Sequence, residues 1–395
     1  MVKVSIVIPT RNRGHLLRYA LNSAVQQTYR DLEIVVCDNY SIDNTREIVD
    51  SFDNRNIIYM RTDKILSMPD NWEFALSKAG GGYIAFLTDD SYLLPDSIST
   101  AMKELDKFNA KVAVWKHCAY FASDWLEPAR RNILYLPKVT FKSYLMNSQT
   151  SLQKLYDMDE QISTIIPKSL NSLCHRSIIE KAIIVQNRFF LPPCPDYTSA
   201  ASILLNVTEY LLIDQPLYID GVTTSSIGAT TSFNLGESTQ KFISEFSEGL
   251  TNICYLGIPT SSAGIAKSME AVRNFYLDTC PEINEKALLC AIVDRLVKVE
   301  TNGMNVDNYW KILDDHIMTQ SRNIKLSTVK QRVLSRLKWI LVKKIRFSPR
   351  LEYLERLRNI QILKGSKCNF NNIEECAQIV ARIVEQRKRK SEKYG

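Results

Sequence analysis

The chain has 395 residues, which is too long for one typical domain, and its 45% hydrophobic and 24% charged residues are ordinary for a folded globular protein. Its nine cysteines include no Cys-x-x-Cys pair, which argues against a disulfide framework and against a zinc site. The net charge of +7 is modest, no apolar run reaches the length of a membrane span, and the N-terminus lacks the layout of a signal peptide. We therefore expect a cytoplasmic protein.

Strand and helix patterns alternate along the N-terminal part of the chain. Short apolar runs typical of buried strands occupy residues 4–9, 32–37, 57–60, 83–87 and 112–115. Segments with apolar residues at helical spacing occupy residues 15–27, 45–52, 71–79 and 96–108. The alternation predicts βαβ units, and hence an α/β fold with a doubly wound, mostly parallel sheet.

The strand at residues 83–87 runs into two adjacent acids, Asp89 and Asp90. Ligands of open α/β sheets bind beyond the carboxyl ends of the strands, so a site is expected here. Neighbouring carboxylates repel each other unless a cation lies beside them, and Mg²⁺ or Mn²⁺ is the natural partner. The alternative is that the pair caps the helix expected to begin near Pro95.

Two other strands end in residues that suit the same site. The second strand ends in Asp38, and the first ends in Pro9-Thr10-Arg11. The chain has neither a Gly-x-Gly-x-x-Gly motif after a strand nor a P-loop motif. A nucleotide held here would therefore need carboxylates for its base and ribose, and a metal for its phosphates.

Four pieces of the sequence together resemble a family 2 glycosyltransferase of the GT-A fold. They are VSIVIPTRNR at residues 4–13, LEIVVCDNYSIDNT at 32–45, NWEFAL at 71–76 and GYIAFLTDDS at 82–91. The resemblance implies an inverting transferase that uses a nucleotide-diphosphate sugar, with a UDP-sugar favoured. We accordingly expect a GT-A catalytic domain at residues 1–230 and a mainly helical, basic domain at residues 231–395.

The resemblance also assigns roles to individual residues. Those expected to bind the nucleotide sugar are Pro9, Thr10, Arg11, Arg13, Asp38, Asn71 and Asp89. Asp38 would contact the base, and the two arginines are candidates for the diphosphate. Asp90 matches the metal-binding acid, whereas Thr88 and Ser91 stand where the family commonly has further acids.

An acid committed to a metal cannot also be the general base for the incoming hydroxyl, so a separate acid is required. Asp196 follows three prolines and begins an expected helix, which is where the family places its base. The alternative is that Asp196 is a helix N-cap. The acidic cluster at residues 157–160 is a rival, and residues 175–176 (His-Arg) are a candidate contact for diphosphate or acceptor, with surface or packing roles as the alternatives.

Later segments complete the expected organisation. Residues 211–221 read as two short strands around Pro216, and residues 222–228 resemble the family's mobile loop over the donor. Helical patterns at residues 241–256, 264–277 and 283–299 follow, without strand alternation.

Residues 325–350 are strongly basic, lack any acid and are rich in aliphatic residues, with Trp339 among them. One interpretation is a helix in the interface of an anionic membrane, which would place a cytoplasmic enzyme peripherally on the inner face of the cytoplasmic membrane. The other is that the apolar residues pack on the catalytic domain and the charges are merely solvated.

The leading hypothesis is a metal-dependent glycosyltransferase that uses Mn²⁺ or Mg²⁺ and builds a surface polysaccharide on a saccharide or lipid-linked saccharide acceptor. A second hypothesis is a non-catalytic sugar-nucleotide-binding partner of another transferase, because Thr88 and Ser91 depart from the family's pattern. A third is a nucleic-acid-binding protein. The basic stripe is aliphatic rather than aromatic, so we expect no nucleic-acid partner.

Overall fold

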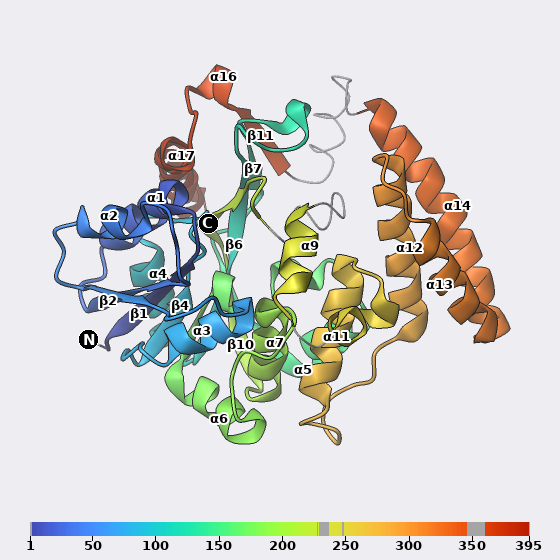
Figure 1. Cartoon of the computed structure of the whole chain (residues 1–395). Helices are drawn as coiled ribbons and strands as arrows, with labels where there is room; N and C mark the ends of the chain where they lie inside the picture. Colours follow the sequence, from blue (N-terminus) through green and yellow to red (C-terminus); the bar gives the residue numbers. More distant parts are fainter. Residues whose placement is uncertain (1, 227, 229–236, 247–248, 346–359, 395) are drawn as a thin grey trace.

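One mixed sheet organises the molecule, and the computed structural model describes residues 2–226, 228, 237–246, 249–345 and 360–394 (Figure 1). Its main path has the strand order β11-β7-β6-β9-β4-β1-β2-β3, and β10 lies off this path, pairing with β5, β6 and β8. The strands are β1 (Val4–Thr10), β2 (Leu32–Asp38), β3 (Ile57–Arg61), β4 (Tyr83–Phe86), β5 (Tyr92–Leu93), β6 (Val112–Phe121), β7 (Ile133–Pro137), β8 (Ser143–Asn147), β9 (Ser172–His175), β10 (Glu209–Val222) and β11 (Ile360–Lys364).

The first four strands are parallel neighbours, and β10 is parallel to β6. Strands β5, β7, β8, β9 and β11 pair antiparallel with their neighbours. This arrangement confirms the predicted α/β class with a mostly parallel sheet in the N-terminal part.

Helices cover both faces of the sheet. They are α1 (Gly14–Val25), α2 (Thr45–Asp50), α3 (Met68–Leu76), α4 (Ser97–Phe108), α5 (Ser148–Tyr156), α6 (Arg176–Gln186) and α7 (Pro195–Leu205), with short 3-10 turns η1 (Pro128–Arg130), η2 (Ile162–Thr164) and η3 (Ser169–Asn171). On β1, Ile6 and Ile8 join the core beneath α1 and α4, whereas Val7 joins the core that includes α3 and α7. Because successive side chains of a strand point to opposite faces, β1 is buried on both sides, as its uninterrupted apolar run predicted.

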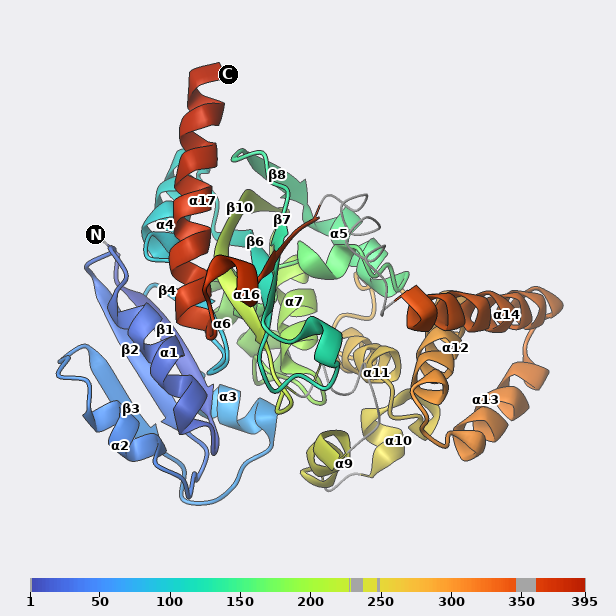
Figure 2. The same cartoon turned by 90° about the horizontal axis from the view of Figure 1, so that it is seen from above.

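The predicted C-terminal helical region is confirmed. It contains α9 (Glu237–Ser244), α10 (Leu250–Ile253), η4 (Tyr255–Gly257), α11 (Ser261–Arg273), α12 (Glu285–Thr301), α13 (Asp307–Thr319), α14 (Arg322–Ile345), α16 (Gly365–Cys368) and α17 (Ile373–Tyr394). Helix α14 packs along α12 at the edge of the molecule remote from β1–β3 (Figures 1 and 2).

The end of the chain returns to the sheet, which the sequence did not indicate. Strand β11 pairs antiparallel with β7, and α17 packs against β10, β5 and α1, with Cys376 and Val380 in a shared core (Figure 2). A five-residue edge strand is too short for its alternation to stand out from helical patterns. Part of the segment 231–395 therefore packs against the central sheet, and the division at residue 230 stays a prediction.

Strand β10 also differs from the expectation of two short strands. It is continuous over 14 residues, with register shifts against β6 on either side of Pro216. Proline cannot donate a ladder hydrogen bond and is tolerated at such irregularities, so it bends the strand without ending it. Among the described helices, none combines the length and the hydropathy needed to cross a membrane.

Candidate active site

The ends of three strands meet at one edge of the sheet. Thr10, the last residue of β1, is the register partner of Asp38, the last residue of β2. β4 pairs with β1 on its other side, and the loop after β4 carries Asp89 and Asp90. The parallel arrangement therefore brings these polar residues to the same edge, as the sequence predicted.

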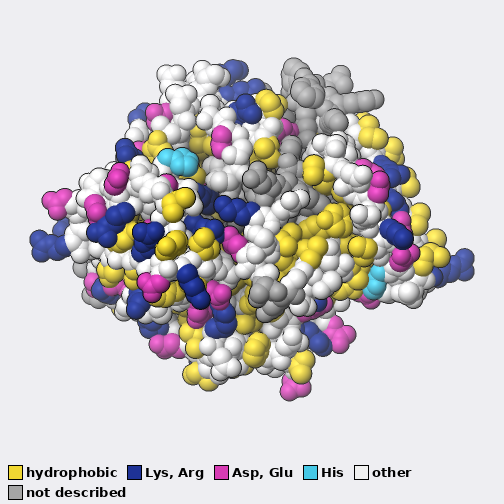
Figure 3. All heavy atoms as spheres, viewed as in Figure 1, with side chains coloured by type: hydrophobic (Ala, Val, Ile, Leu, Met, Phe, Trp, Pro, Cys, Tyr) yellow, Lys and Arg dark blue, Asp and Glu magenta, His cyan; other side chains and the backbone are white. Residues whose placement is uncertain are grey.

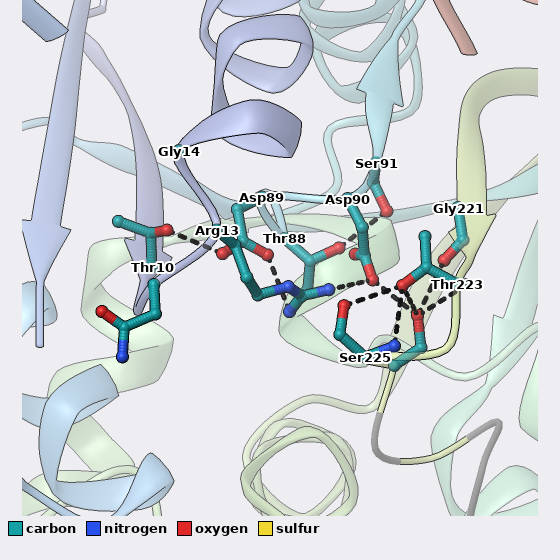
Figure 4. Close-up of polar contacts among 12 residues, drawn as sticks. Thr10, Arg13, Gly14, Thr88, Asp89, Asp90, Ser91, Gly221, Thr223 and Ser225 are labelled. Carbon is teal, nitrogen blue, oxygen red and sulfur yellow. Dashed lines mark hydrogen bonds and ion pairs between the residues drawn. The ribbon is translucent and has the colours of Figure 1, made fainter. Parts of the chain in front are cut away.

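Arg13 joins the two acids. Its guanidinium lies 2.8 Å from Asp89 Oδ1 and 2.5 Å from Asp90 Oδ2, while Thr10 Oγ1 donates a hydrogen bond of 2.7 Å to Asp89 Oδ2 (Figure 4). Arg13 is the residue before α1, so the start of that helix fixes its backbone. Both carboxylates are buried, and the cation lies where two adjacent negative charges require one.

The electrostatics of the pair depend on this contact. Burial raises the pKa of Asp89 to about 6, Arg13 acts to lower it, and the neighbouring Asp90 raises it again. Burial works against the charge of Arg13, but the two carboxylates together raise its pKa above the ordinary value. The guanidinium therefore remains charged and favours the ionised form of Asp89.

Strand β10 packs directly behind Asp90. A Cβ atom on Gly221 would lie 1.8 Å from the carbonyl oxygen of Asp90, so only glycine permits this approach. Ser226, just after the strand, donates a hydrogen bond of 2.7 Å to Asp90 Oδ2. The hydroxyls of Thr88 and Ser91 lie 2.7 Å apart and hydrogen-bond to each other where further acids were expected (Figure 4).

A cavity of about 290 Å³ opens beside the pair. Its walls include Pro9, Thr10, Arg11, Asn12, Arg13, Asn39, Met68, Asn71, Trp72, Thr88, Asp89, Ser225, Lys241, Phe242 and Glu245. Six of the residues predicted to bind the nucleotide sugar are among them; Asp38, Asp90 and Asp196 are not. Lys241, Phe242 and Glu245 come from α9 and the turn after it, beyond the predicted catalytic domain, and Glu245 Oε1 forms an ion pair of 2.6 Å with Arg11.

Asp38 is held by the protein's own donors. Its carboxylate accepts hydrogen bonds from Tyr59 Oη at 2.7 Å and from the backbone N–H of Ser41 at 2.8 Å. It is almost completely buried, and its neighbour Asn39 lines the cavity instead. Asp38 thus shapes the loop after β2, and a contact with a nucleotide base would have to use the remaining lone pairs of its carboxylate.

Asp196 lies near the charge of Lys168, which also acts on Asp220 and His117. It occupies the first turn of α7, whose N-cap is Cys194, so the N-cap alternative does not describe it. Burial raises the pKa of Asp196, and Lys168 acts in the opposite direction. Lys168 Nζ lies 4.9 Å from the centre of the Tyr197 ring.

Asp220 interacts with both Lys168 and the acidic pair. Its pKa is raised to about 7 by burial and by the charge of Asp90, while Lys168 lowers it. Its carboxylate accepts a hydrogen bond of 3.5 Å from Ser91 Oγ. Sequence reasoning passed over Asp220 because it sits inside an apolar strand pattern, although a lone acid between Ile219 and Gly221 was a visible signal.

The rival residues have structural contacts. His175 caps α6, and Arg176 donates hydrogen bonds to backbone carbonyls of Ala79 and Gly81. In the acidic cluster, Glu160 pairs with Arg295 at 3.0 Å. Packing and surface roles account for these groups.

Asp90 has one carboxylate oxygen that could contact a divalent cation. Asp90 Oδ1 accepts no hydrogen bond from any residue that the structure describes, whereas Asp90 Oδ2 accepts hydrogen bonds from Arg13 and Ser226. The described residues hold no group of three or more His, Cys, Asp or Glu side chains placed to bind a metal. A cation here would therefore take most of its ligands from a diphosphate and water, as Mg²⁺ does when one or two carboxylates hold it.

Comparisons with known proteins agree with this geometry. The family model described as Glycosyl transferase family 2 matches residues 5–183. A GalNAc(5)-diNAcBac-PP-undecaprenol beta-1,3-glucosyltransferase of Campylobacter jejuni is 36% identical over 115 residues, covering 28% of this chain and 37% of the relative. A UDP-Glc:alpha-D-GlcNAc-diphosphoundecaprenol beta-1,3-glucosyltransferase, WfaP, of Escherichia coli is 34% identical over 99 residues, covering 25% of this chain and 39% of the relative.

The fold has a counterpart among solved structures. The crystal structure of S. aureus TarS 1-349 in complex with UDP-GlcNAc aligns with a TM-score of 0.54 at 15% identity, covering 86% of this chain and 92% of that chain. At this identity the likeness concerns the fold alone. The match to the two bacterial relatives spans less than two-fifths of their length. The chain therefore carries, at residues 5–183, a domain of glycosyl transferase family 2 with the GT-A fold.

Proposed function

We propose that the protein transfers a sugar, with inversion, from a nucleotide-diphosphate sugar to a hydroxyl of a lipid-linked saccharide. The observation that carries the proposal is the acidic pair Asp89–Asp90, bridged by Arg13 at the edge of a cavity. The charge of Lys168 acts on both Asp196 and Asp220, and Asp220 accepts a hydrogen bond from Ser91 beside that pair. This arrangement offers a binding place for the donor phosphates and a separate acid for the acceptor.

The cavity supports the binding of a donor nucleotide. Arg11 and Arg13 place two cations at its wall, and arginine suits phosphate oxygens because its guanidinium donates hydrogen bonds in a planar fork. Asn39, Asn71 and Trp72 add polar and aromatic surface beside them. We propose a UDP-sugar as the donor, with the base between the loops after β1 and β2.

Asp90 would hold Mg²⁺ or Mn²⁺ together with the donor diphosphate. Bound there, the cation would supply Lewis-acid stabilisation of the charge that develops on the leaving diphosphate. Arg13 would keep its contact with Asp89, and Thr10 would fix the orientation of that carboxylate. Ser226 and Gly221 would hold Asp90 from the other side.

Asp196 would act as the general base. A carboxylate with a raised pKa takes a proton more readily near neutral pH, and the burial of Asp196 produces that shift. Lys168 would keep Asp196 ionised before the acceptor binds. Because Asp196 is not a wall of the donor cavity, its loss should affect the rate more than donor binding.

The acceptor class rests on the relatives. Two of them are named for transfer to undecaprenol-diphosphate-linked saccharides. We extend that class to this chain and propose a cytoplasmic enzyme of surface-polysaccharide synthesis that works at the inner face of the membrane.

The test is transfer from radiolabelled UDP-, GDP- and dTDP-sugars to polyprenyl-diphosphate saccharides, with Mn²⁺ or Mg²⁺. Asp196→Asn should lower kcat by about 10²–10⁴ with little change in donor KM. Asp90→Asn should abolish transfer while the fold persists. Asp50→Asn is a matched control, because Asp50 is an exposed acid paired with Arg46 and is not a wall of the cavity. Wild-type turnover by either acid variant, or no transfer from any donor, would reject the proposal.

A further inference from the structure

Helix α14 turns polar side chains towards the protein. Thr328 and Ser335 are buried against the molecule. Asp294 of α12 accepts hydrogen bonds from Ser335 Oγ at 2.6 Å and from Trp339 Nε1 at 3.2 Å, and Lys338 Nζ lies 3.2 Å from the same carboxylate. A polar seam therefore holds α14 in place.

The outer face of α14 is apolar. Seven large aliphatic side chains are between 49% and 62% exposed: Leu326, Val329, Val333, Leu334, Leu337, Ile340 and Leu341. At 3.6 residues per turn, five of them follow one line along the helix, and Leu334 and Leu341 widen that line on one side. A surface helix ordinarily buries such a stripe and exposes serine and threonine. The reversal indicates that a partner covers the outer face.

The charges on α14 indicate which partner. Residues 322–345 contain no acid. Arg332, Arg336 and Lys338 form ion pairs with acids of α12 and α13. Lys325 and Lys330 have no such pair among the residues that the structure describes, and hydrophobic and basic side chains interleave along this edge of the molecule (Figure 3). The outer face thus combines aliphatic side chains with cations that lack a protein counter-charge.

We propose that the outer face of α14 binds the surface of an anionic lipid bilayer. The helix would lie in the plane of the interface, with its aliphatic side chains among the acyl chains and Lys325 and Lys330 at the lipid phosphates. A second copy of the chain fits less well, because two α14 helices face to face would bring basic surfaces together with no acid on either helix. The stripe is also wider than the narrow seam of a two-stranded coiled coil.

The structure also corrects which residues of this segment face outward. Trp339 lies in the segment expected at the interface, but it contacts Asp294 of α12, as does Lys338. The membrane-facing set is instead the seven aliphatic residues with Lys325 and Lys330. This inference does not depend on the proposed reaction, since binding is measured without turnover.

The test is flotation of the full-length protein with phosphatidylcholine vesicles that contain graded amounts of phosphatidylglycerol. Wild type should bind in proportion to the anionic lipid and dissociate at high salt. Changing Leu326, Leu337 and Leu341 to Gln should weaken binding by roughly a hundredfold or more, because three buried aliphatic side chains are lost. Changing Lys325 and Lys330 to Gln should weaken it by about 25-fold, since each basic residue contributes about fivefold.

A matched control separates this face from exposed apolar residues in general. Ile184, Val185 and Leu277 are also exposed, on other elements, and changing these three to Gln should leave binding unchanged. All variants should keep the wild-type melting temperature and the wild-type transfer rate with a water-soluble acceptor.

Three results would overturn the inference. One is the absence of wild-type binding to anionic vesicles, and another is equal binding by the Leu→Gln variant. The third is a wild-type protein that dimerises with increasing concentration in sedimentation velocity without lipid, together with a Leu→Gln variant that stays monomeric. A second copy of the chain would then cover the outer face of α14. If the wild-type protein binds anionic vesicles but transfers no sugar, that result would instead count against the proposed function alone.

Discussion

Replacing Arg13 by Gln tests whether the acidic pair is a cation site. Arg13 provides the ion pairs at 2.8 Å and 2.5 Å that compensate Asp89 and Asp90, and all three groups are mostly shielded from water. Removing one partner of a buried ion pair typically costs about 3–5 kcal/mol. Part of that cost is avoided here, because Asp89 already has a pKa of about 6 with Arg13 present and will take up a proton once the cation is gone. We therefore expect a loss near the lower limit, about 3 kcal/mol.

A divalent cation should reverse this loss. A ligand at a hundred times its Kd stabilises the native state by about 2.7 kcal/mol, so saturating Mn²⁺ should restore most of the stability of Arg13→Gln. Wild type should gain less, since the Arg13 guanidinium already compensates the two carboxylates and repels a second cation beside them. The assay is chemical unfolding at neutral pH, with and without Mn²⁺.

The control is Arg11→Gln, which removes a cation from the same cavity without touching the acidic pair. Arg11 pairs with Glu245, so any loss of stability in that variant should not respond to Mn²⁺. Equal stabilisation of wild type and Arg13→Gln by Mn²⁺ would refute the reasoning, as would an Asp90→Asn/Arg13→Gln double variant that still responds to the metal.

Three further predictions concern β10 and its neighbours. Gly221→Ala should destabilise the protein by about 1–3 kcal/mol in a melting assay and should lower kcat in the transfer assay, because its Cβ would clash with the Asp90 backbone. Gly80→Ala is the control: its Cβ would meet ordinary contacts at 3.4 Å, so neither stability nor kcat should change. Burial holds the pKa of His117 at about 4, below its unfolded value near 6.5. The free energy of unfolding of the wild type should therefore fall by up to about 3 kcal/mol as the pH drops from 7 to 4. The urea midpoint of His117→Gln should lack this pH dependence. Asp220, with a pKa of about 7, keeps its proton in the folded state at pH values where the unfolded chain has released it. Its contribution to stability is therefore lost as the pH rises from about 4 to 7. Asp220→Asn should remove this pH dependence from the free energy of unfolding.

Much of the site could be predicted because its residues lie at the ends of strands. The apolar runs of β1, β2 and β4 are local patterns, and parallel strands necessarily bring their carboxyl ends together. The positions of Thr10, Asp89 and Asp90 follow from that rule without any tertiary contact being known.

The contacts between distant segments could not be predicted in this way. Arg11 and Glu245 are 234 residues apart in the sequence, and no periodicity connects them. The bridge from Arg13 to both acids depends on the direction of a side chain at the start of α1, which spacing does not report. The sequence showed that the basic segment is rich in aliphatic residues, but only the exposure of these residues and the contacts of Asp294 show which of them face outward.

The C-terminal region contributes to two surfaces with different chemistry. Its first helix, α9, supplies Lys241 and Phe242 to the wall of the cavity, and Glu245 ties the following turn to Arg11. A fragment cut at residue 230 would therefore lack one wall of the cavity. At the far edge, α14 is held by the polar seam at Asp294, which orients the helix without using its aliphatic side chains. Because the seam leaves those side chains available, attachment to a membrane would need no rearrangement of the cavity, and the donor site and the proposed membrane surface can be altered separately by substitution.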